Sequence, residues 1–219
     1  MNVDWIPAVF LLTLGYVSAL SPSDVSYPLK VSPGNGACDF SGVNAESMVD
    51  VVLNRLPVEH TVPDEESHEI IPGVTVGKFA VYSGLSNLRP FGPVLAYCRD
   101  DLRFLHVVLD VTRGNIRITL PWYTCEDARG AVGAFARGKF AVSFQVVNGT
   151  GTDGLKLVLH SGPSPLYVDN VYAFLEGAGP SVDSAFKVLG IMFSGIVKET
   201  WLHYLTPVLK EVFKNATAL

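Results

Sequence analysis

The sequence predicts an α+β fold in which a strongly curved antiparallel sheet wraps around a long C-terminal helix, with a short helix before the sheet. Apolar residues recur at every third or fourth position in residues 44–57 and again in residues 181–214, as helices require. Between these segments apolar and polar residues alternate, which is the period of half-buried strands. The strands follow one another with only turn residues between them, so we expect antiparallel pairing.

The first residues resemble a secretory signal. Residues 5–17 are almost entirely apolar and end in small residues, with Val17 and Ala19 at the positions that a signal peptidase reads. We therefore expect residues 1–19 to be a cleaved signal peptide; a buried N-terminal helix is the alternative. Residues 20–43 are rich in Ser, Pro and Gly and read as an irregular leader. Residues 44–219 are expected to form a single domain of a secreted protein, with no segment that spans a membrane stably.

The short helix begins after Asn44, a side chain suited to cap it, and stops before Pro57. Its apolar stripe consists of Met48, Val49, Val52, Leu53 and Leu56. The acidic segment that follows, residues 58–69, is expected to be a loop. Strands are then predicted in residues 74–83, before a turn at residues 84–87, and in residues 89–98, 102–111, 115–125, 139–147 and 155–160. Gly114 can adopt a positive φ, so residues 112–115 are expected to form a hairpin turn.

The last helix is expected to run from Ser181 to about Lys214 and to lie along the concave face of the sheet. Its wide apolar band includes Phe186, Leu189, Phe193, Ile196 and Trp201. Pro207 stands inside this pattern and removes one backbone hydrogen bond, so we expect a bend there that follows the curve of the sheet.

Charge and cysteines limit the function classes. The net charge is −5, and the mildly basic middle of the chain lacks the dense basic stripe that nucleic-acid binding requires. Three cysteines in a secreted chain imply one bridge and a leftover thiol, or a bridge between chains. If residues 112–115 form a hairpin, Leu102 lies opposite Cys125, and Cys98 lies at the same end of the sheet. We therefore predict a Cys98–Cys125 disulfide, with Cys38 free or paired between chains.

Two sequons, at Asn148 and Asn215, are expected to carry N-linked glycans, and Asn148 is the better candidate because the residues around it read as an exposed loop.

Candidate catalytic and metal-binding residues are few. Ser86 lies in a turn without the second glycine of a nucleophile elbow, and Ser161 and Ser164 stand beside His160 among prolines that indicate a loop. His60 and His68 flank acidic residues, but no fixed spacing holds them as metal ligands. His203 could face a pocket, although a core or surface role is more usual. The sequence therefore predicts no enzyme, no cofactor and no metal.

Three stretches carry a resemblance to a known family. The segment FAVYSGLSNL (residues 79–88) resembles the strand-to-turn segment of the group 7 mite allergens. The last helix, SVDSAFKVLGIMFSGIVKETWLHYLTPVLKEVF, is similar to theirs, including the step Leu205-Thr206-Pro207 followed by Lys210. The spacing of turns between Leu88 and Tyr123 also agrees. These allergens belong to the superfamily of bactericidal/permeability-increasing protein, lipopolysaccharide-binding protein, and juvenile-hormone-binding and takeout proteins. The resemblance covers residues 44–216.

The resemblance implies a hydrophobic tunnel or groove between sheet and helix, and so a non-enzymatic protein that binds a lipid or another hydrophobic small molecule. The residues expected to face the ligand are Val49, Leu53, Leu56, Phe186, Leu189, Phe193, Ile196 and Tyr204. The alternative is a secreted protein-interaction or host-defence module without a functional cavity. Two departures matter: the acidic charge argues against endotoxin binding, and only Cys38 precedes the first helix, so the N-terminal disulfide of the hormone carriers is absent.

Overall fold

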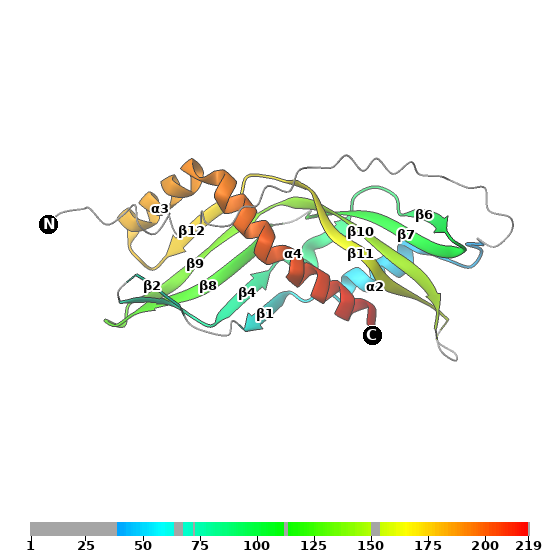
Figure 1. The fold of residues 1–219 in the computed structure, drawn as a ribbon, viewed down its shortest axis with the longest axis horizontal. Coiled ribbons are helices and arrows are strands. Elements are labelled where there is room, and N and C mark those ends of the chain that lie inside the picture. The colour runs from blue at the N-terminus through cyan, green and yellow to red at the C-terminus, as the bar shows by residue number, and fades with distance from the viewer. Residues whose placement is uncertain (1–38, 64–67, 72, 112–113, 150–153, 219) are drawn as a thin grey trace. The chain divides into compact units, whose positions relative to one another are not determined.

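The chain folds into two curved antiparallel sheets, a short N-terminal helix and two helices that end the chain (Figure 1). This computed structural model describes residues 39–63, 68–71, 73–111, 114–149 and 154–218. The described residues belong to one compact unit, residues 34–219. The predicted signal peptide and most of the predicted leader lie outside them. The α+β class predicted from the sequence is confirmed.

Helix α2 (Ala45–Asn54) forms where the apolar stripe predicts it. The side chain of Asn44 accepts a hydrogen bond from the backbone N–H of Ser47 at 3.1 Å, which satisfies one of the free donors of the first turn. The predicted cap is therefore confirmed. The helix buries Val49, Val52 and Leu53 against the rest of the unit.

The first sheet has the strand order β1-β4-β8-β3-β2, with β9 paired to β8 and β12 paired to β9. Its strands are β1 (Glu59–Pro63), β2 (His68–Ile71), β3 (Val74–Val76), β4 (Phe79–Ser83), β8 (Ile116–Thr124), β9 (Arg129–Ala136) and β12 (Tyr172–Glu176). The second sheet has the order β11-β10-β7-β5, with β6 also paired to β7. Its strands are β5 (Leu88–Pro90), β6 (Leu95–Arg99), β7 (Leu102–Val111), β10 (Gly138–Asn148) and β11 (Leu155–Val168).

The predicted hairpin between residues 102–111 and 115–125 is wrong, because β7 and β8 lie in different sheets. Strand β10 occupies one edge of β7 along most of its length, and β5 and β6 occupy the other edge. No edge of β7 is left for β8, so the chain crosses from the second sheet to the first. The strands are therefore not one continuous meander.

Some strands were not predicted, and their composition explains why. Strand β9 consists largely of Ala and Gly, which show no alternation of apolar and polar residues. A β carbon at Gly133 would lie 1.9 Å from the carbonyl oxygen of Ile118, so the strand needs glycine there to pair with β8. Residues 161–166, expected to be a loop because of their prolines, continue β11; that strand lies at a sheet edge, where proline is tolerated.

Strand β1 likewise forms in the segment that was expected to be an acidic loop; its residues pair with β4 from Glu59↔Ser83 to Pro63↔Phe79. The hydrogen-bonded pairing with β4 makes this segment a strand, although its composition predicts a loop.

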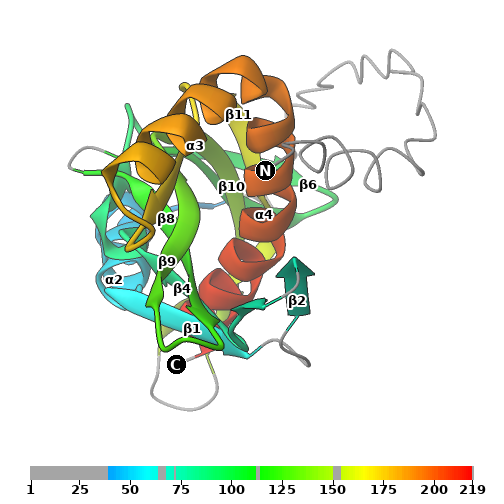
Figure 2. The ribbon, with the colours of Figure 1, turned by 90° about the vertical axis from the view of Figure 1, so that its left-hand side faces the viewer.

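The C-terminal helix is broken in two, contrary to the single helix predicted. Helices α3 (Pro180–Met192) and α4 (Ser194–Ala218) meet at Phe193 with a bend of 91°, and Figure 2 shows the sharp turn between them. The helix continues through Pro207, where the bend was expected. Pro207 lies on the exposed side of α4, so water can reach the carbonyl group that lacks its helical partner.

Among the described residues, no single helix is long and apolar enough to cross a membrane; α3 and α4 reach that length and composition only as a bent pair.

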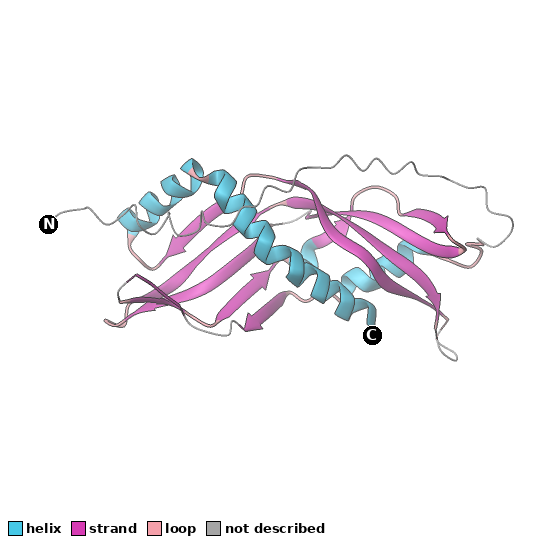
Figure 3. Ribbon diagram, in the orientation of Figure 1, coloured by secondary structure: helices cyan, strands magenta, loops and turns pink. Residues whose placement is uncertain are grey.

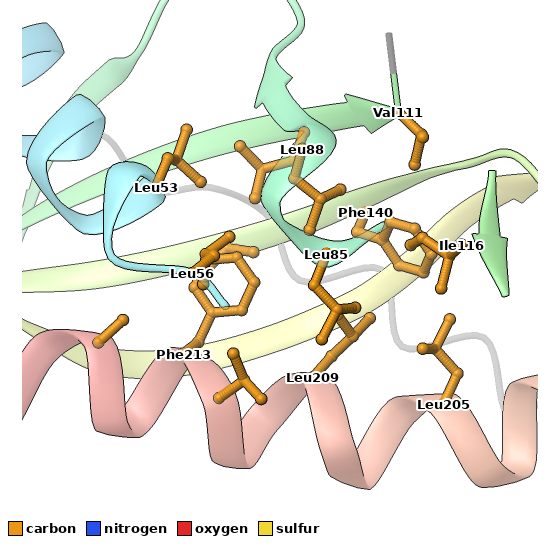
Figure 4. Close-up of a cluster of buried hydrophobic side chains, with 14 of the residues drawn as sticks. Leu53, Leu56, Leu85, Leu88, Val111, Ile116, Phe140, Leu205, Leu209 and Phe213 are labelled. Atoms are coloured by element: carbon orange, nitrogen blue, oxygen red, sulfur yellow. The ribbon is translucent and has the colours of Figure 1, made fainter. Parts of the chain in front are cut away.

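The core lies where α4 crosses the two sheets (Figure 3). In Figure 4 the buried side of α4, represented by Leu205, Leu209 and Phe213, faces residues of α2, of both sheets and of the segments that connect them. These residues are Leu53, Leu56, Leu85, Leu88, Val111, Ile116 and Phe140. The ring centroids of Phe144 and Phe213 lie 6.2 Å apart, which joins the second sheet directly to the helix. The amphipathic pattern of residues 201–213 is thus a core-forming face.

The predicted Cys98–Cys125 disulfide is wrong, because Cys125 is an exposed free cysteine. Cys98 pairs with Arg103 in the β6–β7 ladder of the second sheet. Cys125 follows β8 in the first sheet, and its backbone N–H bonds the carbonyl oxygen of Gly73. Figure 1 shows β6 and this end of β8 at opposite ends of the ribbon. The prediction failed because it depended on the pairing of β7 with β8.

Candidate functional site

The eight residues expected to face a ligand fall into two groups. Val49 and Leu53 of α2, and Leu56 just after it, are almost completely buried and belong to the continuous core. Figure 4 shows Leu53 and Leu56 in this core. The five helix residues, Phe186, Leu189, Phe193, Ile196 and Tyr204, are all partly or largely exposed. The structure therefore does not bring the two groups onto one surface. A closely packed core leaves little room for a ligand at the first group.

Many of the exposed apolar residues lie along α3 and in the first turn of α4. We call this region the elbow surface: it consists of Val182, Val188, Leu189, Ile191, Met192, Phe193 and Ile196. Their exposed fractions range from 36% to 69%, and Ile191 and Met192, next to the bend, are the most exposed. Soluble proteins seldom leave so many large apolar side chains of one region uncovered.

The elbow is held by its backbone and by the first sheet. The N–H of Phe193 bonds the carbonyl oxygen of Leu189 at 2.9 Å, and the N–H of Val197 bonds that of Phe193 at 3.1 Å. Hydrogen bonding thus continues on both sides of the bend. Gly190 is buried, and a β carbon there would lie 3.0 Å from the β carbon of Ala173 on β12. Lys198 of α4 also donates to the carbonyl oxygen of Val168 at 3.2 Å.

The sheet beneath α3 offers a further apolar row. Leu120, Val132 and Leu175 lie opposite one another across β8, β9 and β12. Because side chains alternate along a strand, this row shares its face with Ile118, a core residue, and with Ala173, which contacts α3. The side chains of Leu120, Val132 and Leu175 are only half-buried. An apolar face therefore extends from the core toward the elbow.

Open pockets lie elsewhere on the described surface. One of about 610 Å³ lies between β11 and the last turns of α4, with Val158, His160, Lys210 and Lys214 among its walls. Another of about 520 Å³ lies where the chain crosses between the sheets, beside Tyr167 and Tyr172. Among the described residues that line these two pockets, there is none of the eight residues predicted to face a ligand.

The candidate catalytic serines lie in ordinary backbone positions. Ser86 lies in the single 3₁₀ turn η1 (Leu85–Asn87), and its carbonyl oxygen accepts a hydrogen bond from Arg89. Ser161 and Ser164 are exposed on β11. Among the described residues, a close Ser–His pair that the sequence did not suggest joins His106 Nδ1 and Ser143 Oγ at 2.9 Å across β7 and β10. It lies mid-sheet, not on a turn that would present a nucleophile.

The histidines considered as ligands are dispersed. His60 lies on β1, and the acidic residues after it lie outside the described residues. The ring of His160 packs on Phe104 with centroids 4.6 Å apart, and exposed His203 contacts the edge of Tyr204. No cluster of three or more His, Cys, Asp or Glu able to hold a metal ion occurs in the described part of the chain.

Both predicted glycosylation sites are exposed. Asn148 ends β10, and its side-chain oxygen accepts a hydrogen bond from Arg103 at 3.3 Å. Asn215 lies within α4. Asn148, at a strand end beside a loop, stays the better candidate acceptor.

Comparison of the sequence with protein-family models and with curated proteins gave no match.

Proposed function

We propose that the chain is a secreted, non-enzymatic protein that binds a lipid or another hydrophobic small molecule at the elbow surface. We also propose that it belongs with the group 7 mite allergens and their superfamily, on the sequence patterns given above. The single observation that carries the binding proposal is the exposure of large aliphatic side chains at the meeting of α3 and α4.

The energetics favour an apolar occupant. Each Å² of apolar surface removed from water contributes about 25 cal/mol, so a ligand that covers about 300 Å² gains roughly 7 kcal/mol before the cost of association. The half-buried row Leu120, Val132 and Leu175 would extend the contact area beyond the helices. The residues that define the elbow surface are all apolar, so they suit alkyl chains or rings.

A secreted protein-interaction or host-defence module is the alternative. One observation favours it: the elbow surface is open to solvent, while Val49, Leu53 and Leu56 are packed in the core. A broad open apolar surface suits a protein partner as well as a small ligand.

A titration with a fluorescent fatty acid such as cis-parinaric acid separates the two. Ile196→Asp introduces a charge at a side chain that is 48% exposed, and Phe79→Asp does the same at a residue that is 53% exposed on β4. Both positions are open enough for the fold to survive. We expect the parent chain to bind the probe, Ile196→Asp to weaken binding about tenfold, and Phe79→Asp to leave it unchanged.

The outcomes differ clearly. If the parent protein binds no probe, the ligand proposal fails and the interaction module replaces it. If Phe79→Asp weakens binding as much as Ile196→Asp does, the probe binds elsewhere and the elbow assignment fails. A melting curve for each variant shows that the fold is retained.

A further inference from the structure

A second candidate site lies where three connections between the two sheets converge. These are the connection from β7 to β8, represented by Gly114 and Asn115, and the connections from β9 to β10 and from β11 to β12. Between them lies a pocket of about 520 Å³, which we call the junction pocket. It is defined by Asn115, Phe135, Arg137, Tyr167, Asn170 and Tyr172. Ligand pockets occur preferentially where structural units meet.

Hydrogen bonds between the connections hold the junction pocket in shape. Arg137 Nε donates to the carbonyl oxygen of Gly114 at 3.0 Å, which ties the second connection to the first. The backbone N–H of Asp169 donates to the carbonyl oxygen of Arg137 at 3.0 Å, which ties the third to the second. Buried Ala136 and Val168 support the floor. The pocket is therefore built from the backbone of three segments and does not depend on one loop.

One wall of the junction pocket is aromatic. The rings of Phe135 and Tyr172 stack with their centroids 5.6 Å apart and their planes 28° from parallel. Tyr172 is 50% exposed, and Tyr167, near the end of β11, is 59% exposed. The hydroxyl of Tyr167 donates to the carboxylate of Asp169, and this bond raises the pKa of Tyr167 above its ordinary value.

The remaining side chains of the junction pocket are polar and balanced in charge. Asn115 and Asn170 each carry an amide that both donates and accepts hydrogen bonds. Asp169 retains acceptor capacity beyond its bond from Tyr167, and Arg137 contributes donors. One cation and one anion give the lining a net charge of zero.

We propose that the junction pocket binds a neutral saccharide. The C–H face of a pyranose ring is apolar and slightly positive, so it packs against the electron-rich face of an exposed tyrosine ring. Its hydroxyl groups both donate and accept, and they match amides, a carboxylate and a guanidinium set around an aromatic wall. The lining carries no excess positive charge to favour an anionic sugar, and a lipid chain would cover the amides of Asn115 and Asn170 without replacing their hydrogen bonds to water. The site is independent of the elbow surface and of the ligand proposed there.

The test uses the full chain and three neutral probes, chitotriose, maltotriose and mannotriose, titrated by saturation-transfer NMR. Tyr172→Ala removes part of the aromatic wall, and Asn170→Ala removes an amide; both residues are exposed, so neither change should disturb the core. Tyr123→Ala is the matched control, because Tyr123 is 45% exposed on β8 and does not line the pocket.

We expect at least one trisaccharide to bind, Tyr172→Ala and Asn170→Ala each to weaken it by about tenfold, and Tyr123→Ala to leave it within twofold. Absence of binding by all three probes at millimolar concentration would overturn the proposal. Equal binding by the parent and Tyr172→Ala would also overturn it, because the sugar would then lie elsewhere. Binding of heparin disaccharide in place of the neutral probes would refute the neutral class.

Discussion

A β carbon added to Gly190 would come within 3.0 Å of the β carbon of Ala173, so α3 lies directly on β12 at this point. We expect Gly190→Val to push α3 away from the sheet, because its added branches have no space against the backbone of β12. The free energy of unfolding should fall by about 1–3 kcal/mol, as overpacked positions usually show. Urea denaturation measures the change.

Gly195→Val provides the control for this change. A β carbon at Gly195 meets nothing within 4 Å, although it lies in the first turn of α4. Its unfolding free energy should stay within about 0.5 kcal/mol of the parent value. If the two variants lose the same free energy of unfolding, then the contact between α3 and β12 is not the reason that residue 190 must be small.

Trp201 tests the packing of α4 against the sheets. Its side chain is 2% exposed, and its buried Nε1–H has no hydrogen-bond partner among the described residues. Trp201→Phe removes this donor and keeps a ring, so we expect a loss below about 1.5 kcal/mol. Trp201→Ala should cost about 3–5 kcal/mol because it leaves a cavity. Chemical denaturation of both variants decides; equal losses would mean that Nε1 has a partner, such as a bound water.

Pro207 interrupts the hydrogen bonding of an otherwise continuous helix, and its side chain is exposed. Pro207→Ala should therefore stabilise the protein by about 1–3 kcal/mol, because alanine restores the missing N–H and fits the helix. The melting temperature should rise. Lys210→Ala, at an exposed position of the same helix, should change it little. A lower melting temperature for Pro207→Ala would mean that the proline adjusts the path of the helix against the core.

The cysteines give a covalent prediction. Cys98 takes part in a disulfide, Cys125 is an exposed free thiol, and the chain contains three cysteines. The third cysteine, Cys38, lies outside the described residues and is the partner we propose for Cys98. We therefore expect non-reducing peptide mapping to link the peptides of Cys98 and Cys38, and Cys125 to react with iodoacetamide without reductant. A peptide that joins Cys98 to Cys125 would contradict the arrangement of the two sheets.

The sequence by itself determined those helices and strands whose own residues specify them. Asn44 identified the start of α2, because an asparagine side chain that caps a helix acts within four residues of itself. The alternation in residues 102–111 and 139–147 identified β7 and β10, because each buries one face. The repeat from Trp201 to Phe213 identified the buried side of α4. These patterns were enough for the α+β class.

The tertiary structure alone decided how those elements pair and which of them face water. Strand β7 cannot pair with β8 because other strands already occupy both of its edges. These strands are β10 on one edge and β5 and β6 on the other, and the sequence of β7 itself does not reveal them. The break at Phe193 could not be foreseen, because the residues on both sides of it are apolar and helical in pattern; contact of Gly190 with Ala173 accompanies the new direction of the chain. For the same reason Val49 and Ile196, alike in the sequence pattern, differ in place: the first is in the core and the second lies open to solvent. Hydrophobic periodicity shows which face of a helix or strand is apolar. Only the packing of distant segments determines whether that face is covered or left in water.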